Sequence, residues 1–125
     1  MTRILLDSWA WLEMFSGSPK GEKVRKEIKA ASELLTTAAN LYEVLYRTNE
    51  NAGTEAADKA MEFIETHSQI VEIGKQTAIA AAEIRRNEKL HALDAFTLAA
   101  SRLNEAQLVT GDPHFKNVKN VIFIE

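Results

Sequence analysis

Short apolar runs alternate with amphipathic segments along the chain, and this alternation limits the fold more than any other feature of the sequence. The first run, Ile4–Leu6, is continuous and short, which is typical of a strand buried on both faces. The predicted strands are Ile4–Leu6, Glu33–Thr36, Gln69–Ile73, Leu108–Thr110 and Val121–Ile124. Strands that alternate with helices predict an α/β fold with three layers, α/β/α, around a central, mainly parallel sheet of four to five strands.

The segments between these strands carry the starts and stops of helices. Asp7 or Ser8 caps the first predicted helix, which ends at Gly17, and Pro19 begins the second, which runs to about Ala31. Thr37 caps a predicted helix over Ala38–Arg47, and a break follows at Asn49–Gly53. Thr54 caps the next predicted helix, which ends at about His67. The last two predicted helices run from Gln76 to about Asn87 and from Leu93 to Ala106.

Length and composition exclude several classes of protein. The 125 residues are enough for one ordinary domain, and we expect a single domain over residues 1–125. A formal net charge of -3 excludes a large basic field, so any nucleic-acid binding must be local. The absence of cysteine excludes disulfides, thiolate zinc sites and thiol nucleophiles.

The sequence predicts neither a membrane span nor a secretory leader. The longest run without a charged residue, Leu34 to Tyr42, has nine residues, whereas a spanning helix needs about 20 apolar residues. Near the start of the chain, Asp7 interrupts the apolar stretch before it reaches the length of a signal peptide. We therefore expect a cytoplasmic protein without membrane contacts.

Four acidic residues are predicted to meet at one edge of the sheet. Asp7 directly follows the first strand and Asp112 lies just past the fourth, so a parallel sheet brings both to its carboxyl edge. Glu43 lies in the second turn of the helix that leaves the second strand, and Asp94 lies at the start of the helix that leads into the fourth. Ligands of open α/β sheets bind at this edge.

Converging carboxylates need a positive partner, because like charges raise one another's pKa. Without cysteine or histidines paired at ligand spacing, ligation by oxygen favours Mg2+ or Mn2+ over zinc. Two such ions about 4 Å apart activate water and stabilise the leaving oxygen of a phosphodiester. The acidic residues therefore suggest metal-dependent phosphodiester hydrolysis.

Each acidic residue also has a purely structural alternative. Asp7 can cap a helix, and Asp94 can complement the dipole at a helix N-terminus. Glu43 can form a helical ion pair with Arg47, and Asp112 can form a turn in Gly-Asp-Pro. Spacing alone leaves these alternatives open.

Four segments of the sequence resemble the PIN-domain family, specifically its small VapC-type toxins. They span nearly the whole chain and each contains one of the four acidic residues. The segments are Ile4–Ser8, Ala39–Val44, Leu93–Ala100 and Leu108–Phe115, of which the last is the most specific.

The resemblance implies a PIN-like fold and a metal-dependent ribonuclease. In that family the acids matching Asp7, Glu43, Asp94 and Asp112 hold Mg2+ or Mn2+ and cleave single-stranded or looped RNA. The same resemblance implies supporting hydroxyls at Ser8 and Thr110, a homodimer, and a cognate antitoxin whose C-terminal segment covers the site.

Other residues carry two interpretations each. Two basic clusters, at 20–29 and at Arg85, Arg86 and Lys89, either guide RNA or are solvated helix faces. His114 is a turn residue or touches the phosphate or the surroundings of the metal. Trp9 and Trp11 belong to the core or an interface, or stack on bases, and Tyr42 and Tyr46 form a stripe suited to a partner helix.

Three functions remain open from the sequence. The first is a toxin ribonuclease, and the second is a housekeeping PIN-domain nuclease for RNA maturation or decay. The third is a non-catalytic protein-interaction module in which the acids are only caps, a turn and an ion pair. A receiver-like domain with an acidic Mg2+ pocket fits poorly, because no acidic doublet follows the first strand and no lysine follows a late strand.

Overall fold

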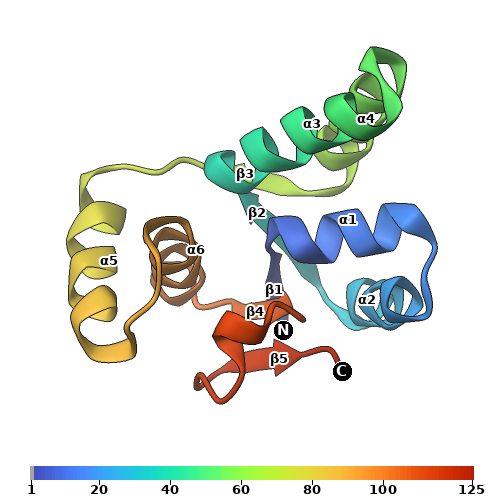
Figure 1. Cartoon of the computed structure of the whole chain (residues 1–125). Helices are drawn as coiled ribbons and strands as arrows, with labels where there is room; N and C mark the ends of the chain where they lie inside the picture. Colours follow the sequence, from blue (N-terminus) through green and yellow to red (C-terminus); the bar gives the residue numbers. More distant parts are fainter. Residues whose placement is uncertain (1) are drawn as a thin grey trace.

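A computed structural model describes residues 2–125, which form six α-helices, one 3-10 helix and a sheet of five strands (Figure 1). The strands are β1 (Arg3–Leu6), β2 (Glu33–Thr37), β3 (Gln69–Val71), β4 (Gln107–Thr110) and β5 (Val121–Phe123). The helices are α1 (Ser8–Ser16), α2 (Pro19–Ala30), α3 (Ala38–Ala52), α4 (Thr54–His67), α5 (Lys75–Glu88), α6 (Ala92–Leu103) and the 3-10 helix η1 (Pro113–Phe115).

All five strands are parallel, in the order β3-β2-β1-β4-β5. This arrangement confirms the α/β fold predicted from the alternation of apolar runs and helices. β1 is the central strand: Leu5 pairs with Leu35 of β2 on one side and with Leu108 of β4 on the other. The chain leaves β1 toward β2 and later returns to its other side through α5 and α6, so the β1–β4 boundary is a topological switch point.

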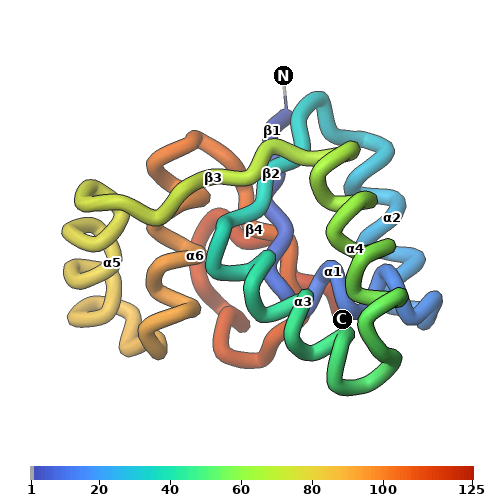
Figure 2. The backbone as a smooth tube through the Cα atoms, turned by 90° about the horizontal axis from the view of Figure 1, so that it is seen from above, coloured from blue at the N-terminus to red at the C-terminus, as the bar shows by residue number. Residues whose placement is uncertain are grey.

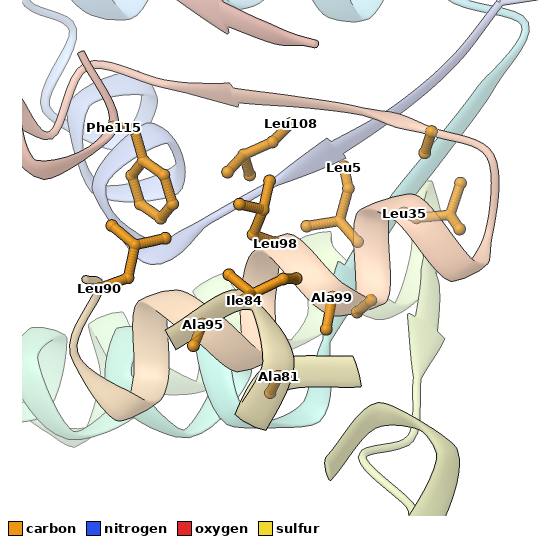
Figure 3. Packing of buried hydrophobic residues seen from close by; sticks show 12 residues of the cluster. Leu5, Leu35, Ala81, Ile84, Leu90, Ala95, Leu98, Ala99, Leu108 and Phe115 are labelled. Carbon is orange, nitrogen blue, oxygen red and sulfur yellow. The ribbon is translucent and has the colours of Figure 1, made fainter. Parts of the chain in front are cut away.

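The two faces of the sheet bury separate hydrophobic clusters, because successive side chains of a strand point to opposite faces. Leu5 packs with residues of α5 and α6 on one face, as Figure 3 shows. Ile4 and Leu6 pack on the opposite face against α1, α2, α3 and α4. Figure 2 shows these two groups of helices on either side of the strands. The three-layer arrangement follows directly from this alternation.

One predicted helix boundary is wrong. The break expected at Asn49–Gly53 is confined to Gly53, and α3 continues to Ala52. Gly53 joins the antiparallel helices α3 and α4 and has a φ of 92°, a conformation that favours glycine. Residues 49 to 52 contain neither glycine nor proline and remain helical. Thr54 is the first residue of α4 rather than its cap, and its hydroxyl accepts a hydrogen bond from Asn49 Nδ2 at 3.1 Å.

The remaining elements agree with the predicted ones to within a few residues, and the predicted Thr37 cap of α3 is present. β3 ends two residues earlier than expected, at Val71, and α6 ends at Leu103 instead of Ala106. Among residues 2–125, no helix combines the length and apolar character that crossing a lipid bilayer requires.

The close packing of α1 on α2 predicts a large effect of one methyl group. A Cβ atom at Gly21 would lie 2.2 Å from the backbone oxygen of Glu13 and 3.0 Å from the Cα atom of Met14. Gly21→Ala should therefore lower the free energy of unfolding by about 1–3 kcal/mol in urea titrations. Gly74→Ala is the matched control, because no atom lies within 4 Å of its added Cβ. Equal stability of the two variants would contradict this account of the helix pair.

Candidate functional site

The carboxyl ends of β1 and β4 place two acidic residues side by side. Asp7 follows β1 and Thr110 is the last residue of β4. The Thr110 hydroxyl donates a hydrogen bond to Asp7 Oδ2 at 2.5 Å and accepts one from the backbone N–H of Asp112 at 3.0 Å. One buried hydroxyl thus connects Asp7 with the loop that carries Asp112.

The Asp7 carboxylate is almost completely buried at this edge, with 5% of its surface exposed. Its Oδ1 atom accepts a hydrogen bond from the backbone N–H of Ala10 at 2.9 Å, which caps α1. Burial raises the pKa of Asp7 from 3.8 to about 7, because a charged carboxylate is poorly solvated there. The hydrogen bonds from Thr110 and Ala10 lower this pKa, while the charges of Asp112 and Asp94 raise it.

Asp94 and Asp112 lie close together with His114 between them. Asp94 is in the first turn of α6, and Asp112 caps η1 by accepting the backbone N–H of His114 at 3.0 Å. His114 Nδ1 lies 3.0 Å from Asp94 Oδ2 and 3.4 Å from Asp112 Oδ1. Each of the three residues offers a ligand atom, and these atoms lie within 4.8 Å of one another. Burial also raises the pKa of Asp94, an effect that the His114 hydrogen bond opposes.

Glu43 lies at the margin of this cluster. Its Oε1 atom accepts a short hydrogen bond from the Ser8 hydroxyl, and its Oε2 atom lies 3.2 Å from Arg47 Nη1. Because Ser8 follows Asp7 directly, this bond brings Glu43 next to the β1 end. Neither Glu43 nor Asp7 is in the group formed by Asp94, Asp112 and His114, although the charges of Asp94 and Asp112 act on Asp7.

The structural alternatives for all four acids are present together with their clustering, since Asp94 lies in the first turn of α6. Asp7 caps α1, Asp112 caps η1, and Glu43 pairs with Arg47. Each contact engages part of the carboxylate and leaves it at the same edge of the sheet. The capping roles therefore do not exclude a role in binding, because the cap bonds also fix the orientation of the acids.

The sequence did not single out Asn40 and Thr97, which connect the helices that carry Glu43 and Asp94. Asn40 is buried, and its Oδ1 atom accepts hydrogen bonds from Thr37 Oγ1 at 2.7 Å and from Thr97 Oγ1 at 3.2 Å. The only signal in the sequence is local, since Thr37 and Asn40 have the spacing of a helix cap. The hydrogen bond between Asn40 and Thr97 forms only because α3 packs next to α6, so no pattern in the sequence predicts it.

An aromatic residue fixes the spacing between the two acidic loops. Trp9 lies against Gly111, where an added Cβ would be 2.3 Å from Trp9 Cη2. Trp11 is completely buried and donates a hydrogen bond from Nε1 to Thr36 Oγ1 at 3.0 Å, so it belongs to the core. A stacking role on bases is therefore excluded for Trp11 in this fold.

Other candidates lie outside the cluster. Tyr42 and Tyr46 are exposed on α3, with ring centroids 5.1 Å apart, and the expected partner helix stays a prediction. Arg85 and Lys89 line a cavity of about 270 Å³ together with Leu90 and His91. The His91 ring lies 5.2 Å from the His114 ring, so this cavity is close to the acidic residues.

The donor set fits a small divalent cation. Asp7, Asp94 and Asp112 are close enough for their charges to raise the pKa of Asp7, so the site has an excess of negative charge. Carboxylate oxygens are the ligands that Mg2+ and Mn2+ prefer. The donor types at this edge of the sheet therefore fit a divalent cation.

The raised pKa of Asp7 predicts that the metal-free protein loses stability as the pH rises. Between its ordinary value of 3.8 and about 7, folded Asp7 holds a proton that the unfolded chain has released. The free energy of unfolding then falls by up to about 1.4 kcal/mol per pH unit in this window, and below it the stabilisation is fully present. Urea titrations in a chelator should show this slope, which Asp7→Asn should reduce. An unchanged slope in Asp7→Asn would exclude Asp7 as its source, and Asp58→Asn on the exposed face of α4 is the control.

Comparison with protein families gives one match. Residues 4–121, nearly the whole chain, match the PIN domain. No curated protein sequence matches this chain.

Several solved structures share the fold at low sequence identity. A toxin-antitoxin complex from Klebsiella pneumoniae contains a chain with a TM-score of 0.81 and 19% identity, covering 98% of this chain and 98% of that one. FitAcB from Neisseria gonorrhoeae gives a TM-score of 0.76 at 18% identity, covering 98% and 96%. VapC20 from Mycobacterium tuberculosis, described as a toxin that cleaves the sarcin-ricin loop, gives a TM-score of 0.73 at 19% identity. The match covers 94% of this chain and 98% of that one. With the family match over residues 4–121, the fold and the acidic edge of its sheet show that this chain belongs to the PIN-domain family.

Proposed function

We propose that this protein is a metal-dependent endoribonuclease that hydrolyses RNA phosphodiesters, and that it is the toxin of a toxin-antitoxin pair. The observation that carries the proposal is the convergence of Asp7, Asp94 and Asp112 at the switch point of the sheet. The PIN-domain match supports nuclease chemistry, and similar folds in toxin-antitoxin complexes support the toxin role.

We assign Asp7, Glu43, Asp94 and Asp112 as the catalytic residues and as the ligands of Mg2+ or Mn2+. Such a cation, when bound, lowers the pKa of a water molecule and stabilises the leaving oxygen of a phosphodiester. Burial of Asp7 supports this assignment, because it opposes the charged form of the carboxylate, which a nearby cation would favour.

The surrounding hydrogen bonds hold these carboxylates in place. Thr110 and the backbone N–H of Ala10 each fix one oxygen of Asp7, and the Ser8 hydroxyl fixes one oxygen of Glu43. Ligands that are already oriented need little reorganisation when metal and substrate bind. In this proposal Ser8 and Thr110 are therefore supporting residues.

The basic cluster on α5 is better placed to guide RNA than the cluster on α2. Arg85 and Lys89 line a cavity with His91, whose ring lies against that of His114 beside the acids. On α2, Lys23 bonds to the backbone oxygen of Glu125 instead. Cations next to the acidic site would attract the phosphates on either side of the bond to be cleaved.

An apolar groove offers a site for the antitoxin. It has a volume of about 540 Å³ and lies between α1, α3 and α4, with Leu12, Phe15, Ala56, Ala60 and Phe63 in its lining. Such a groove suits the apolar face of an amphipathic helix. The proposal includes an antitoxin with a helix in this groove and a C-terminal segment that covers the acidic site, a homodimer, and action in the cytoplasm.

Asp94→Asn should remove RNA cleavage without unfolding the protein. The substitution keeps the shape of the side chain but takes a negative charge from the cluster. We expect a loss of at least about 100-fold in the cleavage rate of a labelled RNA in Mn2+, since changes around metal ligands already cost about 10- to 100-fold. The control Asp58→Asn changes an exposed acid on α4 and should cleave at the parent rate. Cleavage by Asp94→Asn at the parent rate would refute the proposed site.

Expression in a bacterial host distinguishes a toxin from a housekeeping nuclease. A toxin should arrest growth within a few generations of induction, and the arrest should be lost in Asp94→Asn at equal protein level, because it requires RNA cleavage. Growth at the normal rate with a chain that cleaves RNA in vitro would favour the housekeeping alternative. Absence of both cleavage and growth arrest would favour the interaction module.

A further inference from the structure

The imidazole of His114 lies where a metal ligand would lie, although the sequence predicted ligation by oxygen alone. Its Nδ1 atom is 3.0 Å from Asp94 Oδ2 and 3.4 Å from Asp112 Oδ1. Neighbouring ligands of an octahedral ion with bonds of about 2.1 Å are about 3 Å apart, because their bonds meet at right angles. The two distances from His114 Nδ1 are thus close to the spacing of neighbouring ligands, and all three ligand atoms lie within 4.8 Å of one another.

We propose that His114 is a metal ligand through Nδ1 and that it makes this centre prefer Mn2+ over Mg2+. This inference rests on the proposed metal centre and specifies its donor set. The site then contains one nitrogen ligand among carboxylates, which distinguishes it from a purely acidic site.

The backbone around His114 holds the ring at the cluster. Phe115 is buried in the core and anchors η1, and the backbone N–H of His114 bonds to Asp112 Oδ1 at 3.0 Å. Figure 3 shows the Phe115 ring next to Leu90, the residue before His91. The His91 ring packs edge to face against the His114 ring at 5.2 Å. These contacts fix Nδ1 toward the two acids.

A nitrogen ligand changes which cation binds best. Mg2+ prefers oxygen ligands in a nearly ideal octahedron and gives up its water reluctantly. Mn2+ also favours carboxylate ligands, but as a transition-metal ion it binds imidazole nitrogen more readily than Mg2+ does, and zinc binds imidazole more strongly than either. When imidazole takes the place of a water molecule or a carboxylate as a ligand, the preference of the site therefore shifts away from Mg2+.

The contact between His114 and Asp94 also allows a second role for His114, and this role predicts the opposite result for coupling between the ring nitrogen and the cation. His114 would then donate a hydrogen bond from Nδ1 to Asp94 and remain outside the coordination sphere, as a residue that only orients a ligand. In that case the ring nitrogen never bonds to the cation. Magnetic coupling between the cation and nitrogen separates the two roles.

Electron spin-echo measurements on the Mn2+-loaded protein test the proposal. Directly bound imidazole gives modulation from 14N, which 15N labelling of histidine should alter. We expect this signal in the parent and in His67→Leu, the control at an exposed histidine of α4, and its absence in His114→Leu. Circular dichroism checks that both variants are folded. Bound Mn2+ without nitrogen coupling, or coupling that persists in His114→Leu, would overturn the ligand assignment.

Calorimetry with Mn2+ and with Mg2+ completes the test. In His114→Leu we expect the affinity for Mn2+ to fall by at least about tenfold and the affinity for Mg2+ to fall less. Equal losses for both cations would overturn the preference for Mn2+. Absence of Mn2+ binding in the parent would refute the proposed metal centre itself, whereas binding without a contribution from His114 would leave that centre in place.

Discussion

The parallel pairing of β1 with β4 is the contact on which the acidic site depends. It joins the end of the strand before Asp7 to the end of the strand before Asp112, although more than 100 residues of chain separate them. The hydroxyl of Thr110 contacts both of these segments. Helices α5 and α6 then return the chain so that Asp94 reaches the same edge. The remaining strands and helices bury this central pair on both faces.

The same edge gathers four acids, of which Glu43 is paired with Arg47, while Asp94 and Asp112 contact His114. Burial and the neighbouring carboxylates oppose ionisation of Asp7, so the fold is strained electrostatically by the groups that would bind a cation. A chain selected only for stability would place an apolar or amide side chain there. The presence of several acids next to hydrogen-bond donors that orient them therefore supports the proposed metal site.

Much of the fold followed from local patterns, and the site followed only in part. Continuous apolar runs marked the strands because parallel strands are buried on both faces, and the position of Asp7 and Asp112 after two runs placed both at one edge. The predicted length of α3 was wrong because asparagine and glutamate are tolerated both in loops and in helices. Packing against α4 determines that this segment is helical. The contacts of His114 with Asp94, and of Asn40 with Thr97, join distant segments, so no local pattern indicates them.

The contact of Trp9 with Gly111 restricts how the sequence around the site can change over evolutionary time. A Cβ atom at 111 would lie 2.3 Å from Trp9 Cη2 and 2.8 Å from the backbone oxygen of Ile124, so a smaller residue at position 9 would remove only one of the two clashes. A larger residue at 111 would force the neighbouring segments apart, whereas a smaller one at 9 would leave a cavity. Position 111 should therefore remain glycine across related sequences, and this restriction would record the distance between neighbouring segments rather than the chemistry of the acids they carry.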